Sequence, residues 1–123
     1  MSEEKIKRSE DEEQIAVCQW LTFLGVDFIH VPNEGKRSLA TARKLKAMGM
    51  KKGFPDLFIF AVRGKYHGLA IEMKVEGGRP TREQRDWLNR LHRQGYAAGV
   101  CYGADEAIKA ISRYLELKPG ESK

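Results

Sequence analysis

Two charged residues interrupt an apolar segment near the middle of the chain. In LAIEMKV (69–75), Glu72 and Lys74 are two residues apart, so in a β-strand both side chains leave on the same face. Met73, between them, points to the opposite face, toward the core. Charges on a buried face are costly unless that face opens onto a cleft. The string therefore indicates either a site in a cleft or an exposed Glu–Lys pair on an edge strand.

A third candidate, Asp56, stands in GFPDLFIF (53–60), before the apolar run LFIFAV (57–62). Pro55 loses little there, because the first residue of a strand can lack a hydrogen-bond donor. The connection RGKYHG (63–68) is short enough for an antiparallel hairpin. Such a hairpin brings Asp56 beside Glu72 and Lys74. Asp56 then either caps a turn or shares a site with them.

Two carboxylates and an ammonium group suit one kind of chemistry in particular. Mg²⁺ prefers hard oxygen ligands and accepts one or two protein carboxylates together with water and phosphate oxygens. The carbonyl of Met73 lies between the two functional side chains and is a candidate third ligand. A bound metal activates water, and a lysine beside that water can orient it or stabilise charge. The residue types predict metal-assisted phosphodiester hydrolysis, with Mn²⁺ expected to substitute for Mg²⁺.

The elements that must position this set can be predicted from capping residues and apolar spacing. Ser9 and Glu12 resemble a capping box that opens a helix over 10–24. The strand VDFIHV (26–31) follows, and then a basic helix over 39–48. The apolar stripe of the first helix is expected at Ile15, Cys18, Trp20, Leu21 and Leu24. The inward residues of the basic helix are expected at Leu39, Ala42, Leu45 and Met48.

The second half of the chain continues the alternation of helices and strands. Thr81 and Gln84 form another capping-box signature, opening a helix that ends at Gly95. The strand AAGVCY (97–102) and a helix over 105–117 complete the order α-β-α-β-β-α-β-α. Inward residues are expected at Trp87, Leu88, Leu91, Ile108, Ile111 and Leu115. This order predicts an α/β sandwich around a small mixed sheet, within one domain whose core spans about 10–117.

Charge distribution indicates a partner. The chain has 123 residues and a net charge of +5, and no acidic residue stands between Gly35 and Gly53. The basic residues of this segment are Lys36, Arg37, Arg43, Lys44, Lys46, Lys51 and Lys52. A local positive excess favours a polyanion, most often nucleic acid, although a solvated basic helix face has the same composition.

The ordered motifs, taken together, resemble the VRR-NUC domains (virus-type replication and repair nucleases) of the PD-(D/E)XK nuclease superfamily. The motifs are Glu10 and Gln14, the string PNEG (32–35), GFPD (53–56), Glu72-Met73-Lys74, and Thr81 with Gln84. They extend over about residues 10–115, nearly the whole chain. The resemblance implies a restriction-endonuclease-like fold and a Mg²⁺-dependent deoxyribonuclease.

The resemblance also implies roles for individual residues. Asp56 and Glu72 bind the metal with help from the Met73 carbonyl, and Lys74 serves the water. Glu10 and Gln14, four residues apart on one helix face, match the family's first-helix positions, with Glu10 a possible metal ligand. Glu12 and Glu13 are alternatives for that carboxylate.

Two further motif residues have two interpretations each. Gln84 either caps its helix or faces the cleft toward DNA. The segment with Asn33 and Glu34 is either turn material or the start of a loop that contacts the DNA backbone. The predicted DNA contacts are Asn33, Lys36, Arg37, Arg43, Lys44, Lys46, Lys51, Lys52 and Gln84. The scattered His30, His67 and His92 lack zinc-ligand spacing and are interpreted as structural or solvated.

The hypothesis is a structure-selective DNA endonuclease, acting as a homodimer on branched DNA such as four-way (Holliday) junctions. Two alternatives remain: a non-catalytic nucleic-acid-binding protein with the same fold, and a sequence-specific restriction-type enzyme. No membrane span or signal peptide is expected, and Cys18 and Cys101 are interpreted as reduced core residues. A cytoplasmic location follows, that of the host cell if the compact stand-alone form indicates phage origin.

Overall fold

The computed structural model describes residues 8–32 and 38–122, which form four helices and four strands. In chain order these are α1 (Glu10–Leu24), β1 (Phe28–His30), α2 (Leu39–Ala47), β2 (Leu57–Ile59), β3 (Leu69–Lys74), α3 (Arg82–Arg93), β4 (Ala97–Tyr102) and α4 (Ala104–Leu115). This confirms the predicted order. The strands expected over 26–31 and 57–62 are shorter, since β1 and β2 pair with each other over only three residues each.

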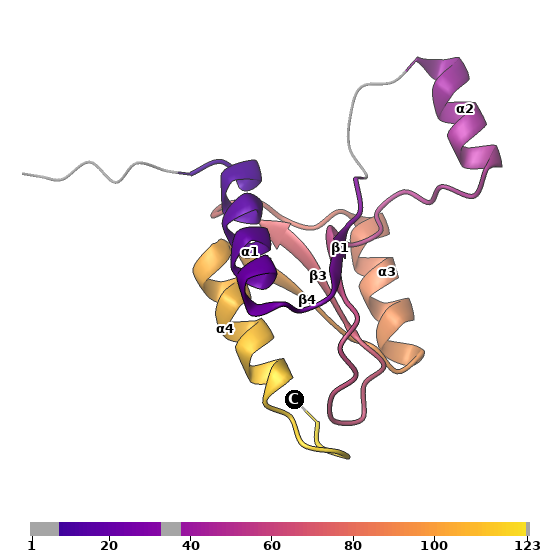
Figure 1. The fold of residues 1–123 in the computed structure, drawn as a ribbon. Helices are drawn as coiled ribbons and strands as arrows, with labels where there is room; N and C mark the ends of the chain where they lie inside the picture. Colours follow the sequence, from indigo (N-terminus) through magenta and orange to yellow (C-terminus); the bar gives the residue numbers. More distant parts are fainter. Residues whose placement is uncertain (1–7, 33–37, 123) are drawn as a thin grey trace, which may run out of the picture.

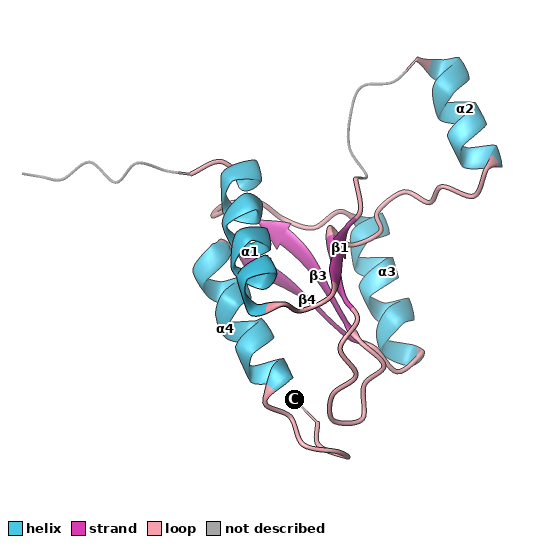
Figure 2. Ribbon diagram, viewed as in Figure 1, coloured by secondary structure: helices cyan, strands magenta, loops and turns pink. Residues whose placement is uncertain are grey.

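The strands form one mixed sheet in the order β1-β2-β3-β4. The pairs β1–β2 and β2–β3 are antiparallel, and β3–β4 is parallel. Helices α1 and α4 lie side by side on one face, and α3 covers the other (Figures 1 and 2). The predicted α/β sandwich with a small mixed sheet is therefore confirmed.

The core lies between the sheet and the α1–α4 layer. Leu69, Ile71 and Met73 alternate along β3 toward this layer, and all are buried. They pack in one hydrophobic cluster with Ile111 and Tyr114 of α4. The Tyr114 hydroxyl donates a hydrogen bond to the Ala61 carbonyl at 2.6 Å, so the buried phenol is satisfied. This packing fixes the position of β3, the strand that carries Glu72 and Lys74.

The buried face of α1 differs from the predicted stripe. Val17 and Leu21 are buried, whereas Ile15 and Leu24, expected to face inward, are exposed. The helix is rotated so that the line through 13, 17 and 21 faces the body. At the N-terminal end of this line of residues, the Glu13 carboxylate accepts a hydrogen bond from the Ala104 N–H at 2.7 Å. A polar tie to the start of α4 thus helps set the rotation of α1, which apolar spacing alone could not indicate.

The prediction that α2 turns an apolar side inward is wrong. No residue of α2 is buried, and the side chains of Leu39 and Met48 are 67% and 72% exposed. The helix extends away from the sheet and its covering helices (Figure 1). Its N-terminus is capped locally, because the Ser38 hydroxyl accepts the Thr41 N–H at 3.1 Å. This cap stabilises the start of the helix, and no residue of α2 is buried against the body.

The two cysteines lie in the core or against it, as expected. Cys18 and Cys101 are both free thiols, and burial raises the pKa of Cys18. Within residues 8–32 and 38–122, no helix combines the length and apolar character that a membrane crossing requires.

Candidate active site

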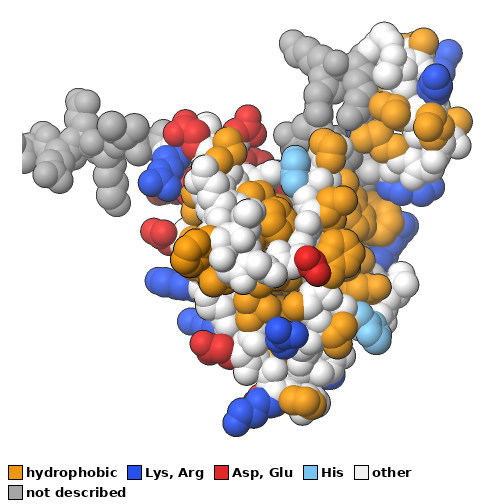
Figure 3. Space-filling model, viewed as in Figure 1, with side chains coloured by type: hydrophobic (Ala, Val, Ile, Leu, Met, Phe, Trp, Pro, Cys, Tyr) orange, Lys and Arg blue, Asp and Glu red, His pale blue; other side chains and the backbone are white. Residues whose placement is uncertain are grey.

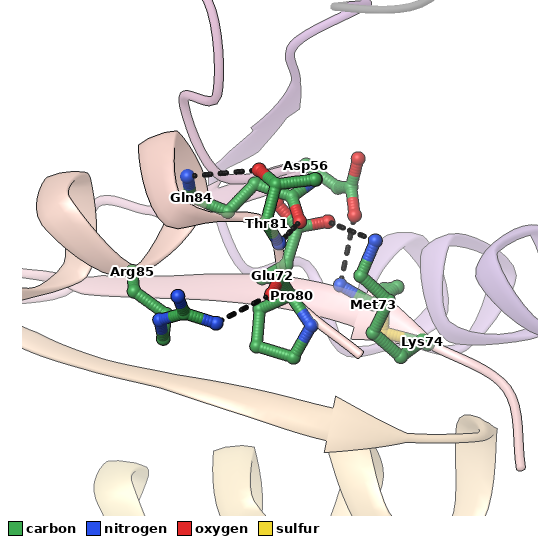
Figure 4. Close-up of polar contacts among 8 residues, drawn as sticks. All are labelled: Asp56, Glu72, Met73, Lys74, Pro80, Thr81, Gln84 and Arg85. Atoms are coloured by element: carbon green, nitrogen blue, oxygen red, sulfur yellow. Dashed lines mark hydrogen bonds and ion pairs between the residues drawn. The ribbon is translucent and has the colours of Figure 1, made fainter. Parts of the chain in front are cut away.

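The register of the central hairpin places Asp56 against Glu72. Leu57 pairs with Ile71, so the residue before Leu57 lies opposite the residue after Ile71. The Asp56 Oδ2 atom accepts a hydrogen bond from the Met73 N–H at 2.8 Å, which orients the carboxylate across the two strands (Figure 4). Asp56 and Glu72 are both buried. The prediction that the hairpin brings these carboxylates together is confirmed.

Lys74 completes the arrangement on the same side of β3. Its ammonium Nζ lies 4.0 Å from Glu72 Oε2, and its side chain is mostly buried (Figure 4). Met73, the intervening residue, is fully buried in the core. The alternation expected from the sequence therefore holds, and the interpretation as an exposed pair on an edge strand is wrong, because β3 lies between β2 and β4.

The third carboxylate comes from the first turn of α1. One carboxylate oxygen each from Glu10, Asp56 and Glu72 lies within 4.8 Å of the others. The two alternative first-helix acids have other partners. The Glu12 carboxylate bonds back to Ser9 in the capping box, and Glu13 accepts from the N–H of Ala104. Glu10 is thus the α1 acid that the fold brings to the site.

Burial makes the charge of Glu72 unfavourable. The residue is 1% exposed, and neither carboxylate oxygen has a hydrogen-bond partner among the described residues. Desolvation is the largest cause that raises its pKa, to about 9; the neighbouring Asp56 carboxylate and the charge of Glu10 add to this effect, and Lys74 opposes it. Without a metal, Glu72 therefore carries a proton at neutral pH.

This donor set fits a divalent cation. Three carboxylates converge, two of them are buried, and the described chain offers a single ammonium group at 4.0 Å from the most buried one. Carboxylate oxygens are the ligands that Mg²⁺ and Mn²⁺ accept. A cation between these groups would relieve the repulsion and bind Glu72, whose carboxylate oxygens have no hydrogen-bond partner among the described residues. Glu10, Asp56 and Glu72 are the residues that would hold it.

Two glutamines expected near the site lie just outside the carboxylate group. Gln84 is buried, and its side-chain oxygen accepts the Thr81 N–H at 2.8 Å in a complete capping box. The capping interpretation of Gln84 is therefore confirmed. Gln14 lies one turn after Glu10 on α1, but its amide nitrogen contacts the His30 Nδ1 atom at 2.7 Å. Gln14 thus reaches the site through His30.

His30 is the residue that sequence reasoning missed. It ends β1, and its Nδ1 atom lies 3.0 Å from the main-chain oxygen of Asp56. The sequence contains no spacing signal for this contact, because it depends on how β1 pairs with the segment before β2. The sequence offers one indication of this contact. His30 is a polar residue at the end of a strand, and that strand lies beside the segment that contains Asp56.

The predicted DNA contacts fall into two groups. Asn33, Lys36 and Arg37 lie outside the described residues. The others of the basic segment, Arg43, Lys44, Lys46, Lys51 and Lys52, are all exposed. Figure 3 shows Lys and Arg side chains on the surface of α2. The segment after α2 is tied to the body by the Trp87 indole, which donates to the Lys52 carbonyl at 3.1 Å.

A sheet flanked by helices, with Asp56 and a Glu72-x-Lys74 pair on adjacent strands and a helical acid beside them, defines a nuclease-type domain of the PD-(D/E)XK class. A family model for the VRR-NUC domain matches residues 4–105. The chain belongs to the VRR-NUC family, as the sequence motifs predicted.

Solved structures agree with this assignment. A VRR_NUC domain protein superposes with a TM-score of 0.82 at 34% identity, covering 96% of this chain and 98% of the other. A second VRR_NUC domain superposes with a TM-score of 0.60 at 22% identity, covering 85% of this chain and 96% of the other, and it shows the fold alone. Curated protein sequences gave no significant match.

Proposed function

We propose that this protein is a Mg²⁺-dependent DNA endonuclease that cuts phosphodiester bonds in branched DNA during replication, recombination or repair. The observation that carries the proposal is the group Glu10, Asp56 and Glu72, two of them buried, whose oxygens lie within 4.8 Å of one another beside Lys74. A binding module has no need to gather three carboxylates and bury two of them, because they repel both one another and DNA phosphate. The arrangement favours catalysis over the non-catalytic alternative.

Each residue has a role in this proposal. Asp56 and Glu72 would hold Mg²⁺ together with Glu10, and the Met73 N–H keeps the Asp56 carboxylate aimed at the site. When bound, the cation lowers the pKa of a coordinated water and neutralises charge on the phosphate. Lys74, held beside Glu72, orients the attacking water and stabilises the negative charge that develops. The Met73 carbonyl remains the proposed additional ligand.

The test is cleavage of a panel of linear, flapped, forked and four-way DNA substrates with matched arm sequences. We expect cleavage with Mg²⁺ or Mn²⁺, none with EDTA, and the fastest cleavage on the branched forms. If no DNA form is cut with either metal, the proposal is wrong. Cleavage of plasmid at defined sequences, regardless of structure, would favour the restriction-type alternative.

We propose that α2 and the segment after it bind the DNA backbone. The helix carries exposed basic side chains and contributes no residue to the core, so its surface is available for a partner. Replacing Lys44 and Lys46 together by alanine should weaken binding and reduce the slope of log K against log salt by up to about 2. Fluorescence anisotropy over a salt series measures this slope.

The matched control is the double replacement of Lys109 and Lys118 by alanine, which removes the same charge from α4 and the residues after it. This control should retain the wild-type slope. An unchanged slope in the Lys44/Lys46 variant would exclude α2 from the DNA interface.

We also propose that two copies associate, which would place two sites symmetrically on a four-way junction. The proposal is supported by large apolar side chains that the described chain leaves exposed, including Phe23 at 86% and others on β1, on α2 and in the segment that follows β2. Figure 3 shows hydrophobic side chains gathered on the face around α1 and β1 and on α2. A surface of this kind is typical of protein–protein contacts.

Light scattering at micromolar concentration should give twice the 14.0 kDa mass of the chain. A mass of one chain at that concentration would contradict the dimer and leave the nuclease proposal standing.

A further inference from the structure

A polar bridge joins α1 to the main chain of Asp56. His30 Nδ1 lies 2.7 Å from the side-chain nitrogen position of Gln14 and 3.0 Å from the Asp56 carbonyl oxygen. Gln14 follows Glu10 by four residues, so the two side chains lie on the same face of α1, one turn apart. The bridge therefore connects two of the three carboxylate-bearing segments directly beside the site.

Only one protonation of the ring makes the contact with Asp56 a hydrogen bond. A carbonyl oxygen only accepts, so the 3.0 Å contact with Asp56 requires a hydrogen on Nδ1. An N–H of Gln14 cannot donate to a nitrogen that already carries a hydrogen. Because the two ends of a glutamine amide exchange places on a half-turn, the consistent arrangement directs the Gln14 oxygen to His30. One Nδ1–H is then shared between Asp56 and Gln14.

Polar contacts hold the first turn of α1 against the rest of the protein. The buried apolar residues of the helix, Val17 and Leu21, lie about two to three turns after Glu10. Before them, side-chain contacts to the body include those of Glu13 with Ala104 and of Gln14 with His30. Apolar packing therefore fixes the far half of α1, and polar contacts fix the half that carries Glu10.

We propose that His30 and Gln14 are a positioning pair, with His30 in its Nδ1–H form, that sets the Glu10 carboxylate at the correct distance from Asp56 and Glu72. The inference rests on the proposed function, because its expected consequence is a change in the strength of metal binding. His30 acts through the helix: it touches the main chain of Asp56 and is not one of the three carboxylates. Asp56 itself stays anchored without His30, since the Val31 N–H donates to the same carbonyl at 2.8 Å.

The first test is the tautomer of the neutral His30 ring in metal-free protein, read from the ¹⁵N chemical shifts of its two nitrogens. We expect the Nδ1–H form, and we expect Gln14→Ala to shift the ring toward a mixture of the two forms. A ring held as Nε2–H would overturn the proposal. This measurement needs neither metal nor DNA, so it judges the pair even if the nuclease proposal fails.

The second test compares Mn²⁺ affinity, followed by electron paramagnetic resonance, with the kcat and KM of DNA cleavage. His30→Ala and Gln14→Ala should each weaken Mn²⁺ binding by about 10-fold and lower kcat, with KM for DNA unchanged. His30→Asn should restore most of the loss, because its amide N–H occupies the place of Nδ1–H. Unchanged Mn²⁺ affinity in both alanine variants would overturn the proposal.

The control variant is His67→Ala. His67 is exposed and stacks edge-on against Tyr96, away from the carboxylates. It should keep wild-type Mn²⁺ affinity and kcat. If wild type neither binds Mn²⁺ nor cuts DNA, the nuclease proposal fails, and the tautomer measurement alone then decides on the pair. Should His30→Ala melt below the assay temperature, the proposal stands or falls on Gln14→Ala and on the rescue by His30→Asn.

Discussion

Replacing Asp56 by asparagine should lower the cleavage rate by about 10³-fold or more, while DNA binding is retained. The amide has nearly the same shape as the carboxylate and keeps an oxygen that can accept the Met73 N–H, now 2.8 Å from Oδ2, so the fold is expected to survive. The change removes one negative charge from the site and with it a ligand for the cation. Removal of a charge that repels phosphate should leave DNA affinity equal or slightly higher.

Cleavage rates and anisotropy on the same substrate measure the two quantities. The matched control is Asp27→Asn. It makes the same chemical change at an exposed residue that immediately precedes β1. This control should cut at the wild-type rate. Cleavage by the Asp56 variant within about tenfold of wild type would remove Asp56 from the proposed chemistry.

The second large effect concerns the stability of the metal-free protein as a function of pH. The folded-state pKa of Glu72 is raised to about 9, so the folded protein binds a proton there that the unfolded chain releases near its ordinary pKa of 4.5. The folded state therefore holds more protons between these values, and the free energy of unfolding decreases as pH rises. The stability that Glu72 contributes is fully present below about pH 4.5, and it is lost progressively as the pH rises from there to about 9.

Glu72→Gln should remove this dependence, because glutamine does not titrate. In EDTA, the difference in unfolding free energy between the variant and wild type should grow with pH to a few kcal/mol near pH 9, in favour of the variant. Urea unfolding at several pH values measures it. Adding Mn²⁺ should reverse the order, since the wild type alone retains the full set of ligands.

The control for this experiment is Glu106→Gln, a change at an exposed residue of α4. It should follow the wild-type pH profile. Parallel profiles for wild type and Glu72→Gln would show that Glu72 is ionised in the folded protein and would contradict the account of its burial.

The strand part of the site could be predicted because its geometry is local. Side chains alternate along a strand, and a short hairpin fixes which residues oppose each other, so Asp56, Glu72 and Lys74 could be placed together from spacing alone. The capping boxes at Ser9 and Thr81 were equally predictable, since each depends on residues three apart in sequence.

The helical part could not be predicted in the same way. Which of Glu10, Glu12 and Glu13 faces the site depends on the rotation of α1, and Ile15 suggested a phase that the structure does not adopt. The deciding contact, Glu13 with Ala104, joins residues far apart in the chain. The exposed position of α2 is a second case, because apolar spacing indicates a buried side only when another element is present to cover it.

The central claim is that Glu10, Asp56 and Glu72 form a divalent-metal site. The most direct measurement is a titration of Mn²⁺ by electron paramagnetic resonance into wild type and Glu72→Gln at equal protein concentration. The account predicts saturable binding to wild type that is at least about 10-fold weaker in the variant. Superimposable curves for the two proteins, or no binding to either, would contradict it.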